Sequence, residues 1–272
     1  MHKEDKKRAQ VTLFIIIALF LVVAIIGIFI VIRNNVGTGD ISTPSSAVGL
    51  DDYVSNCLEQ TLSEGIVLVG RQGGYYTPDL SGVSYIDFSG SDSEPEPLTT
   101  ELPSIKVAYH IYDRENKVPS KEEIEKQISN YVVDKLNLCV QIENYEDRGW
   151  NVVQEPITAN TTIKENETSV RVVWPLTLSK DDALLEAKYF NAKVSVRLGR
   201  VYDITNALNV VQSAFANYTG NLCLSCFMDY KNNDFYTQIL IAEDNSLLFV
   251  ITDLKKELEG EYYDFIFAGR YP

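Results

Sequence analysis

The chain has 272 residues and a formal net charge of −14, and its composition of 45% hydrophobic and 23% charged residues is typical of a globular protein rather than a disordered one. Residues 1–35 carry five cations and two acids, a net +3, which leaves −17 on the remaining 237 residues. Because such an acidic body repels phosphate groups, we expect no nucleic-acid partner.

An uninterrupted apolar run, VTLFIIIALFLVVAIIGIFIVI, occupies residues 11–32 near the N-terminus. As an α-helix, the run would measure about 33 Å, enough to cross a hydrocarbon core of about 30 Å. It is too long for the apolar region of a cleaved secretory signal. The basic segment 1–10 precedes it, so the positive-inside rule predicts a cytoplasmic N-terminus and an extracytoplasmic body. We therefore expect a single-pass protein of the cell membrane, with the lipid bilayer as partner of residues 11–32.

A short basic motif, Lys7-Arg8-Ala9-Gln10, stands directly before the apolar run. The motif resembles the class III signal peptide of archaeal type IV pilin-like proteins. This resemblance implies cleavage between Ala9 and Gln10 and a prepilin peptidase as partner. It departs from filament-forming pilins at the fifth mature position, where those proteins carry Glu and this chain has Phe14. The alternative is that the cations are only the cytoplasmic flank of the membrane segment.

Residues 33–50 are mostly small and polar and contain Pro and Gly, so they are expected to form a flexible tether. Apolar residues spaced by three and four then predict three amphipathic helices, at about Asp51–Val69, Lys121–Tyr145 and Arg200–Tyr218. Gly73-Gly74 is expected to end the first helix, and a capping box at Ser120 to open the second.

The third helix is expected to bury one apolar stripe, formed by Val201, Ile204, Leu208, Val211, Phe215 and Tyr218. Strands are predicted at Val83–Phe88, Ile105–Tyr112, Asn151–Ile157, Ser169–Thr177, Leu184–Leu198, Phe235–Ala242, Leu247–Thr252 and Tyr262–Phe267. Turns are expected at Asn160–Asn166 and Ser179–Asp182. Helices segregated from antiparallel strands predict an α+β ectodomain at residues 51–272, with a helical part at 51–149 and a sheet-rich part at 150–272.

The four cysteines are Cys57, Cys139, Cys223 and Cys226. Outside the membrane an even number of cysteines permits disulfides. The preferred pairing is a bridge between Cys57 and Cys139 on two of the predicted helices, with Cys223–Cys226 as a local pair. Sequence alone does not choose among the three connectivities. A zinc site, a redox C-x-x-C at Cys223 and Cys226, and reduced core thiols remain as alternatives.

Three N-x-[ST] sequons make Asn160, Asn166 and Asn217 candidate glycosylation sites. Two of them fall in the turn expected at 160–166, where an acceptor would be exposed. The sequons are consistent with an external domain.

No catalytic motif is found, so we name no catalytic residue, no metal ligand and no cofactor. The body contains a single histidine, His110, which we interpret as structural because no partner motif accompanies it. Asp181-Asp182 is interpreted as a solvated turn, and Trp150 and Trp174 as core residues.

Several landmarks together resemble a family of membrane-anchored surface proteins of small-genome archaea. They are KKRAQVTLF, CLEQ…EGIVLVGRQGGYY, VWPLTLSK, VRLGRVYDI, CLSC and the C-terminal FIFAGRYP. The resemblance implies a shared scaffold and adds no catalytic residue. The leading hypothesis is an anchored external protein for surface interaction, adhesion or envelope structure, with surface or envelope proteins as partners. A type IV pilin-like subunit and an extracellular thiol oxidoreductase using the C-x-x-C are the alternatives.

Overall fold

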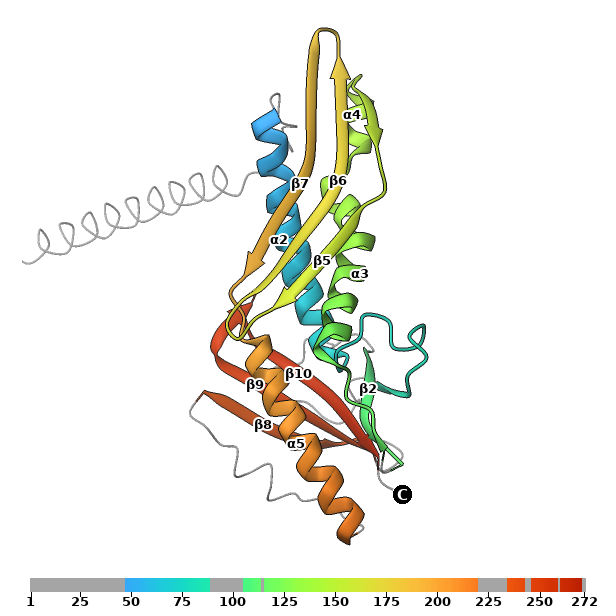
Figure 1. The fold of residues 1–272 in the computed structure, drawn as a ribbon, viewed down its shortest axis with the longest axis vertical. Coiled ribbons are helices and arrows are strands. Elements are labelled where there is room, and N and C mark those ends of the chain that lie inside the picture. Colours follow the sequence, from blue (N-terminus) through green and yellow to red (C-terminus); the bar gives the residue numbers. More distant parts are fainter. Residues whose placement is uncertain are drawn as a thin grey trace, which may run out of the picture. The chain divides into compact units, whose positions relative to one another are not determined.

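The computed structural model describes residues 47–88, 105–113, 115–219, 234–242, 246–258 and 260–270. They belong to one compact unit, Pro44–Pro272, whereas the other unit, Met1–Thr43, lies outside the described residues. Within the described ranges no helix is both long enough and apolar enough to span a bilayer, and the run at 11–32 lies outside those ranges. The described fold is α+β, as predicted, with three long helices and one short helix over two sheets (Figure 1).

The helices begin and end close to the residues predicted. They are α2 (Ala47–Arg71), α3 (Lys121–Val140), α4 (Glu143–Asp147) and α5 (Leu198–Thr219). Helix α2 starts four residues before Asp51, so the last residues of the expected tether are helical and Asp51 is not its N-cap. The helix predicted at 121–145 is divided, because Gln141 adopts a left-handed conformation with φ 47° and ends α3.

A four-stranded antiparallel sheet is built around one long hairpin. Its strands are β4 (Asn151–Gln154), β5 (Thr158–Ile163), β6 (Thr168–Lys180) and β7 (Ala183–Val194). Strand β6 pairs with β7 along one edge, while β4 and β5 share its other edge end to end. Of the turn expected at Ser179–Asp182, residues 181–182 are confirmed, whereas residues 179–180 belong to β6. The turn expected at Asn160–Asn166 is wrong in its first half, because residues 160–163 belong to β5.

Helices α2 and α3 cover one face of this sheet (Figure 1). Alternate residues of β6 point toward the helices and are fully buried, among them Val172, Trp174 and Leu178. They join Leu58 and Ile128 of the helices in one hydrophobic core. Burying large apolar side chains in this way contributes about 1.5–3 kcal/mol each to folding.

The remaining strands form a second sheet of mixed direction. They are β1 (Tyr85–Phe88), β2 (Ile105–Tyr112), β3 (Glu115–Asn116), β8 (Phe235–Ile241), β9 (Leu247–Leu258) and β10 (Glu261–Arg270). The main order is β1-β2-β10-β9-β8, with β3 beside β2. Strands β8, β9 and β10 form the predicted antiparallel meander, but β10 pairs with β2 in parallel. An all-antiparallel arrangement was therefore wrong, and β2, from the part expected to be helical, lies inside this sheet.

The link between the two sheets runs through residues 195–197 and α5. The strand predicted at Leu184–Leu198 ends at Val194, and the chain enters α5 at Leu198. Arg197 lies in this link and is only 6% exposed. Its guanidinium donates from Nε to Asp253 Oδ2 at 2.8 Å and from Nη1 to Asp234 Oδ2 at 3.0 Å. Paired carboxylates allow this charge to be buried at the junction.

Helix α5 buries a different stripe from the one predicted. Val201 and Leu208 are buried as expected, but Val211 and Phe215 are 40% and 37% exposed. Polar residues occupy other inward positions of the helix, where Thr205 and Asn209 are fully buried. The predicted apolar stripe is therefore wrong at Val211 and Phe215, and the side chain of Tyr218 lies outside the described part of the chain.

Candidate functional site

The candidate site begins at the turn that ends α2. Gly74 N–H donates to Val69 O at 2.8 Å and Gly73 N–H donates to Gly70 O at 3.4 Å, which together form a Schellman motif. Gly73 and Gly74 have φ values of 71° and 94°, in the left-handed region that glycine adopts without strain. The expectation that the glycine pair stops the helix is confirmed.

Two buried glutamines fix the loop that follows. Gln72 Nε2 donates to Tyr76 O at 2.8 Å, and Gln127 Oε1 of α3 accepts from Tyr76 N–H at 3.0 Å. The two side chains are only 7% and 5% exposed. Because buried amides are costly to leave unpaired, these bonds hold the loop against the first turns of α3.

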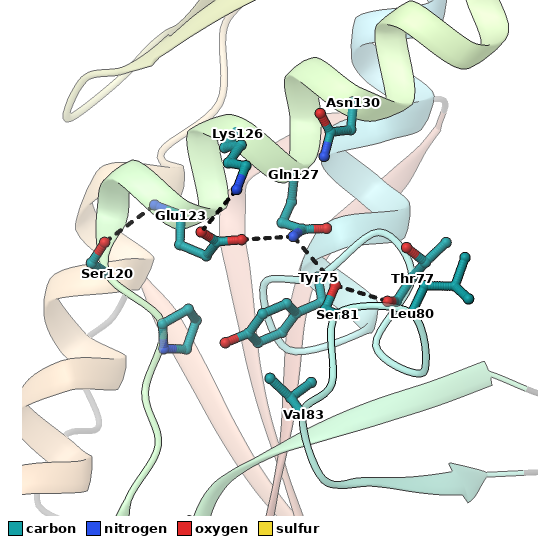
Figure 2. Close-up of a pocket in the computed structure, with 11 residues that line it drawn as sticks. Tyr75, Thr77, Leu80, Ser81, Val83, Ser120, Glu123, Lys126, Gln127 and Asn130 are labelled. Atoms are coloured by element: carbon teal, nitrogen blue, oxygen red, sulfur yellow. Dashed lines mark hydrogen bonds and ion pairs between the residues drawn. The ribbon is translucent and has the colours of Figure 1, made fainter.

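A groove with a volume of about 580 Å³ opens between this loop and α3 (Figure 2). Its polar lining includes Ser81, Ser120, Glu123, Lys126, Gln127 and Asn130, and Tyr75 and Leu80 add apolar surface. The capping box predicted at Ser120 is confirmed on the serine side, since Ser120 Oγ accepts from Glu123 N–H at 3.2 Å.

The charges of the groove are arranged around Glu123. Its carboxylate accepts from Gln127 Nε2 at 2.7 Å, and Lys126 Nζ lies 3.9 Å from its other oxygen. Burial raises the pKa of Tyr75, and the negative charge of Glu123 raises it further. Tyr75 therefore remains a neutral hydroxyl-bearing ring at neutral pH.

The chemistry of the groove is that of a binding surface. Its lining supplies amide and ammonium donors and carboxylate and hydroxyl acceptors, but no cysteine or histidine. Elsewhere in the described part of the chain, no group of three His, Cys, Asp or Glu side chains could hold a metal ion. The arrangement fits recognition of a polar ligand by hydrogen bonds.

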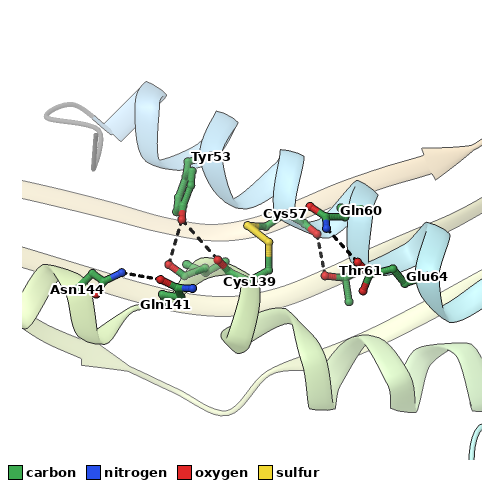
Figure 3. Close-up of a disulfide and its surroundings, with 9 residues drawn as sticks. Tyr53, Cys57, Gln60, Thr61, Glu64, Cys139, Gln141 and Asn144 are labelled. Atoms are coloured by element: carbon green, nitrogen blue, oxygen red, sulfur yellow. Dashed lines mark hydrogen bonds between the residues drawn. A yellow bond between two sulfur atoms is a disulfide. The ribbon is translucent and has the colours of Figure 1, made fainter. Parts of the chain in front are cut away.

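The structure joins Cys57 of α2 to Cys139 of α3 in a disulfide, the pairing preferred from the sequence (Figure 3). The two Cα atoms lie 5.7 Å apart, within the usual range for a disulfide. Tyr53, one turn before Cys57, places its hydroxyl 3.4 Å from Val140 O. The two long helices are thus tied by a covalent bond and a hydrogen bond at the same level.

The glycosylation candidates with described side chains are both exposed. Asn160 lies on β5 and Asn166 in the turn before β6. Asn217 lies in α5. Ala9, Gln10, Cys223 and Cys226 lie outside the described residues.

His110, interpreted from the sequence as structural, is a core residue. It is fully buried in β2, and its ring stacks on Phe267 with centroids 4.6 Å apart. Trp174 is also fully buried, as expected. The ion pair of Arg197 with Asp253 was missed. Its only sequence signal is an arginine between apolar residues in VSVRL, which is also the pattern of a half-buried strand.

No protein-family model, curated protein or solved structure matches this chain.

Proposed function

We propose that this chain is a single-pass, membrane-anchored external protein that acts in surface interaction, adhesion or envelope structure. The observation that carries the proposal is the disulfide between Cys57 and Cys139, which closes a separation of 82 residues. Disulfides persist in oxidising compartments and are rare in the cytosol. The apolar run at 11–32 supplies the anchor in this proposal, with the bilayer as its partner.

Three further features support an external binding role. Asn160 and Asn166 are exposed, as glycosylation acceptors must be. The groove beside α3 offers hydrogen-bonding groups suited to a surface or envelope protein. The resemblance to membrane-anchored archaeal surface proteins agrees with this location.

Protease protection in intact cells tests the proposed topology. The full chain is expressed with one epitope tag at each end, and external protease is added before and after lysis. We expect the C-terminal tag to be lost from intact cells and the N-terminal tag to survive until lysis. A C-terminal tag that is protected in intact cells would contradict the proposal.

A type IV pilin-like subunit, processed by a prepilin peptidase, is the second candidate. Helix α2 begins at Ala47, so only residues 33–46 separate it from the end of the apolar run. This connection is shorter in sequence than the expected tether of residues 33–50, and the helix that follows it packs on a sheet. Mass spectrometry of the mature N-terminus tests it: Gln10 as the first residue supports processing, and a start at Met1 or His2 rules it out.

A further inference from the structure

The four-stranded sheet has one covered and one uncovered face. Helices α2 and α3 pack on the face that buries Val172, Trp174 and Leu178 (Figure 1). Strand alternation directs the intervening residues the other way. We call this second surface the outer face and define it by its exposed or half-buried residues on the three longest strands, where the register shift between Val173 and Leu176 leaves both Lys188 and Tyr189 exposed: Thr158, Asn160 and Thr162 of β5, Ser169, Arg171, Val173, Thr177 and Ser179 of β6, and Leu184, Glu186, Lys188, Tyr189, Asn191 and Lys193 of β7.

The charge of the outer face is opposite to that of the chain. It carries three cations, Arg171, Lys188 and Lys193, against one acid, Glu186, whereas the whole chain carries −14. Lys193 forms an ion pair with Glu167, in which Nζ lies 3.7 Å from Oε2. Within the described residues, Arg171 and Lys188 form no ion pair. Two cations without carboxylate partners on an acidic protein provide a local anion site.

An exposed aromatic ring stands between these two cations. Tyr189 is 55% exposed, and the Arg171 guanidinium carbon and the Lys188 ammonium lie 5.5 and 5.3 Å from its ring centroid. Cation–π attraction at this range orients the two long side chains. Less side-chain entropy is then lost when an anion binds them.

A hollow of about 270 Å³ lies beside this group. It forms at a β-bulge between Val173 and Leu176, where Pro175 interrupts the pairing of β6 with β7. Thr177, Glu186 and Lys188 are among the residues that line it. The outer face is therefore indented next to its cations.

The neutral residues of the outer face decide which anion fits. Short hydroxyl and amide side chains surround the cations, among them Thr158, Thr162 and Asn191. Such groups hydrogen-bond sugar hydroxyls. Nucleic acid would require a denser row of cations.

We propose that the outer face, centred on Arg171, Lys188 and Tyr189, binds an acidic polysaccharide. The cations bind its carboxylates, the threonine and asparagine side chains bind its hydroxyls, and Tyr189 contacts a sugar ring. The repulsion from the acidic body is screened within about 8 Å at physiological salt, so contact at this face remains favourable. The proposal names a ligand class for the surface role above, but the binding itself does not depend on the topology of the chain.

Binding of soluble polygalacturonate to the full chain in detergent tests the proposal. The chain is produced in a host without N-glycosylation, because Asn160 lies on the same face. We expect saturable binding of polygalacturonate and none of neutral dextran. Arg171→Gln with Lys188→Gln should weaken binding by about tenfold or more, and Tyr189→Ala by about fivefold. The double variant Lys117→Gln with Lys255→Gln, which removes two exposed cations elsewhere, should leave binding within about twofold.

Several outcomes would overturn the proposal. They are no binding of polygalacturonate by the unaltered chain, equal losses in the two double variants, or no effect of Tyr189→Ala. Equally tight binding of duplex DNA or phosphatidylglycerol vesicles would show a general anion surface instead. Self-association abolished by Arg171→Gln with Lys188→Gln would identify a second copy as the occupant. None of these results bears on the protease protection experiment. The polysaccharide proposal can therefore be overturned while the proposed membrane topology stands, and the reverse also holds.

Discussion

His110 Nε2 lies 2.8 Å from the carbonyl oxygen of Gly73, inside the core of the protein. Because the carbonyl can only accept, Nε2 carries the proton and donates it. The other ring nitrogen, Nδ1, lies 3.4 Å from Asn209 Nδ2, which is a donor. The ring is therefore neutral, and it connects the turn after α2 to α5 through β2.

Burial lowers the pKa of His110 to about 4, and its hydrogen bond to Gly73 O offsets the effect only in part. The unfolded chain binds this proton near pH 6.5, so between pH 6.5 and 4 the unfolded state holds more protons than the folded state. We expect the free energy of unfolding to fall by about 3 kcal/mol over this window through His110 alone.

Urea unfolding at pH 7 and pH 4.5 measures this loss. His110→Gln keeps an amide that can donate to Gly73 O but has no charge to gain. Its loss of stability over the same window should be smaller, because only the carboxylates remain to titrate. An identical pH dependence in both proteins would contradict the assignment.

Gly73 is expected to tolerate no side chain. A Cβ atom there would lie 3.1 Å from Ala108 O, and the φ of 71° is itself unfavourable for alanine. We expect Gly73→Ala to lower the free energy of unfolding by about 2 kcal/mol or more. Gly82 is a matched control, with a φ of 69° and open space around it, and Gly82→Ala should cost only the backbone strain of about 1 kcal/mol. Thermal unfolding of both variants checks the difference, and equal losses would exclude crowding by Ala108.

Local sequence signals predicted the helices of this fold well. The stripe around Leu58 in α2 and the capping serine before α3 are short-range patterns, and each lies within a few residues of its predicted place. The disulfide could be predicted because Cys57 and Cys139 both lie on these predicted helices. Of the groove beside α3, the sequence predicted only the turn at Gly73-Gly74 and the helix cap at Ser120.

Long-range relationships were not visible in the sequence. Strand β5 reads TANTTI, which has turn composition, and its pairing with β6 makes it a strand. The parallel pairing of β2 with β10 joins Tyr109 to Ala268, far apart in the chain. Helix α5 turns Asn209 inward because the polar groups of β2, including His110, lie opposite it. In each of these cases, contacts with residues distant in the sequence determine the local structure.

The buried ion pair at the sheet junction should be essential for stability. Asp253 is fully buried and accepts from two nitrogens of Arg197, whose guanidinium also lies 4.3 Å from the Phe235 ring centroid. Asp253→Asn removes the buried charge partner of the guanidinium and leaves only the more exposed Asp234, so we expect a loss of about 3 kcal/mol or more in the free energy of unfolding. Asp234→Asn removes the more exposed partner and should cost clearly less. Chemical unfolding compares the two variants, and a larger loss at Asp234 would contradict this account.

The disulfide between α2 and α3 should be the largest single contribution to the stability of the fold. It closes a separation of 82 residues, for which loss of unfolded-chain entropy predicts about 4 kcal/mol. The double variant Cys57→Ser with Cys139→Ser should therefore unfold at markedly lower urea concentration than the parent under oxidising conditions. In dithiothreitol, which reduces the bridge, the two proteins should unfold together.

The second cysteine pair supplies the control for this measurement. Cys223→Ser with Cys226→Ser leaves Cys57 and Cys139 in place, so its unfolding should keep the shift on reduction that the parent shows. Non-reducing peptide mapping should find the peptides of Cys57 and Cys139 linked in the parent and in this control. Free thiols at both positions would show that the helices are held by packing alone, and the argument for an oxidising compartment would lose its basis.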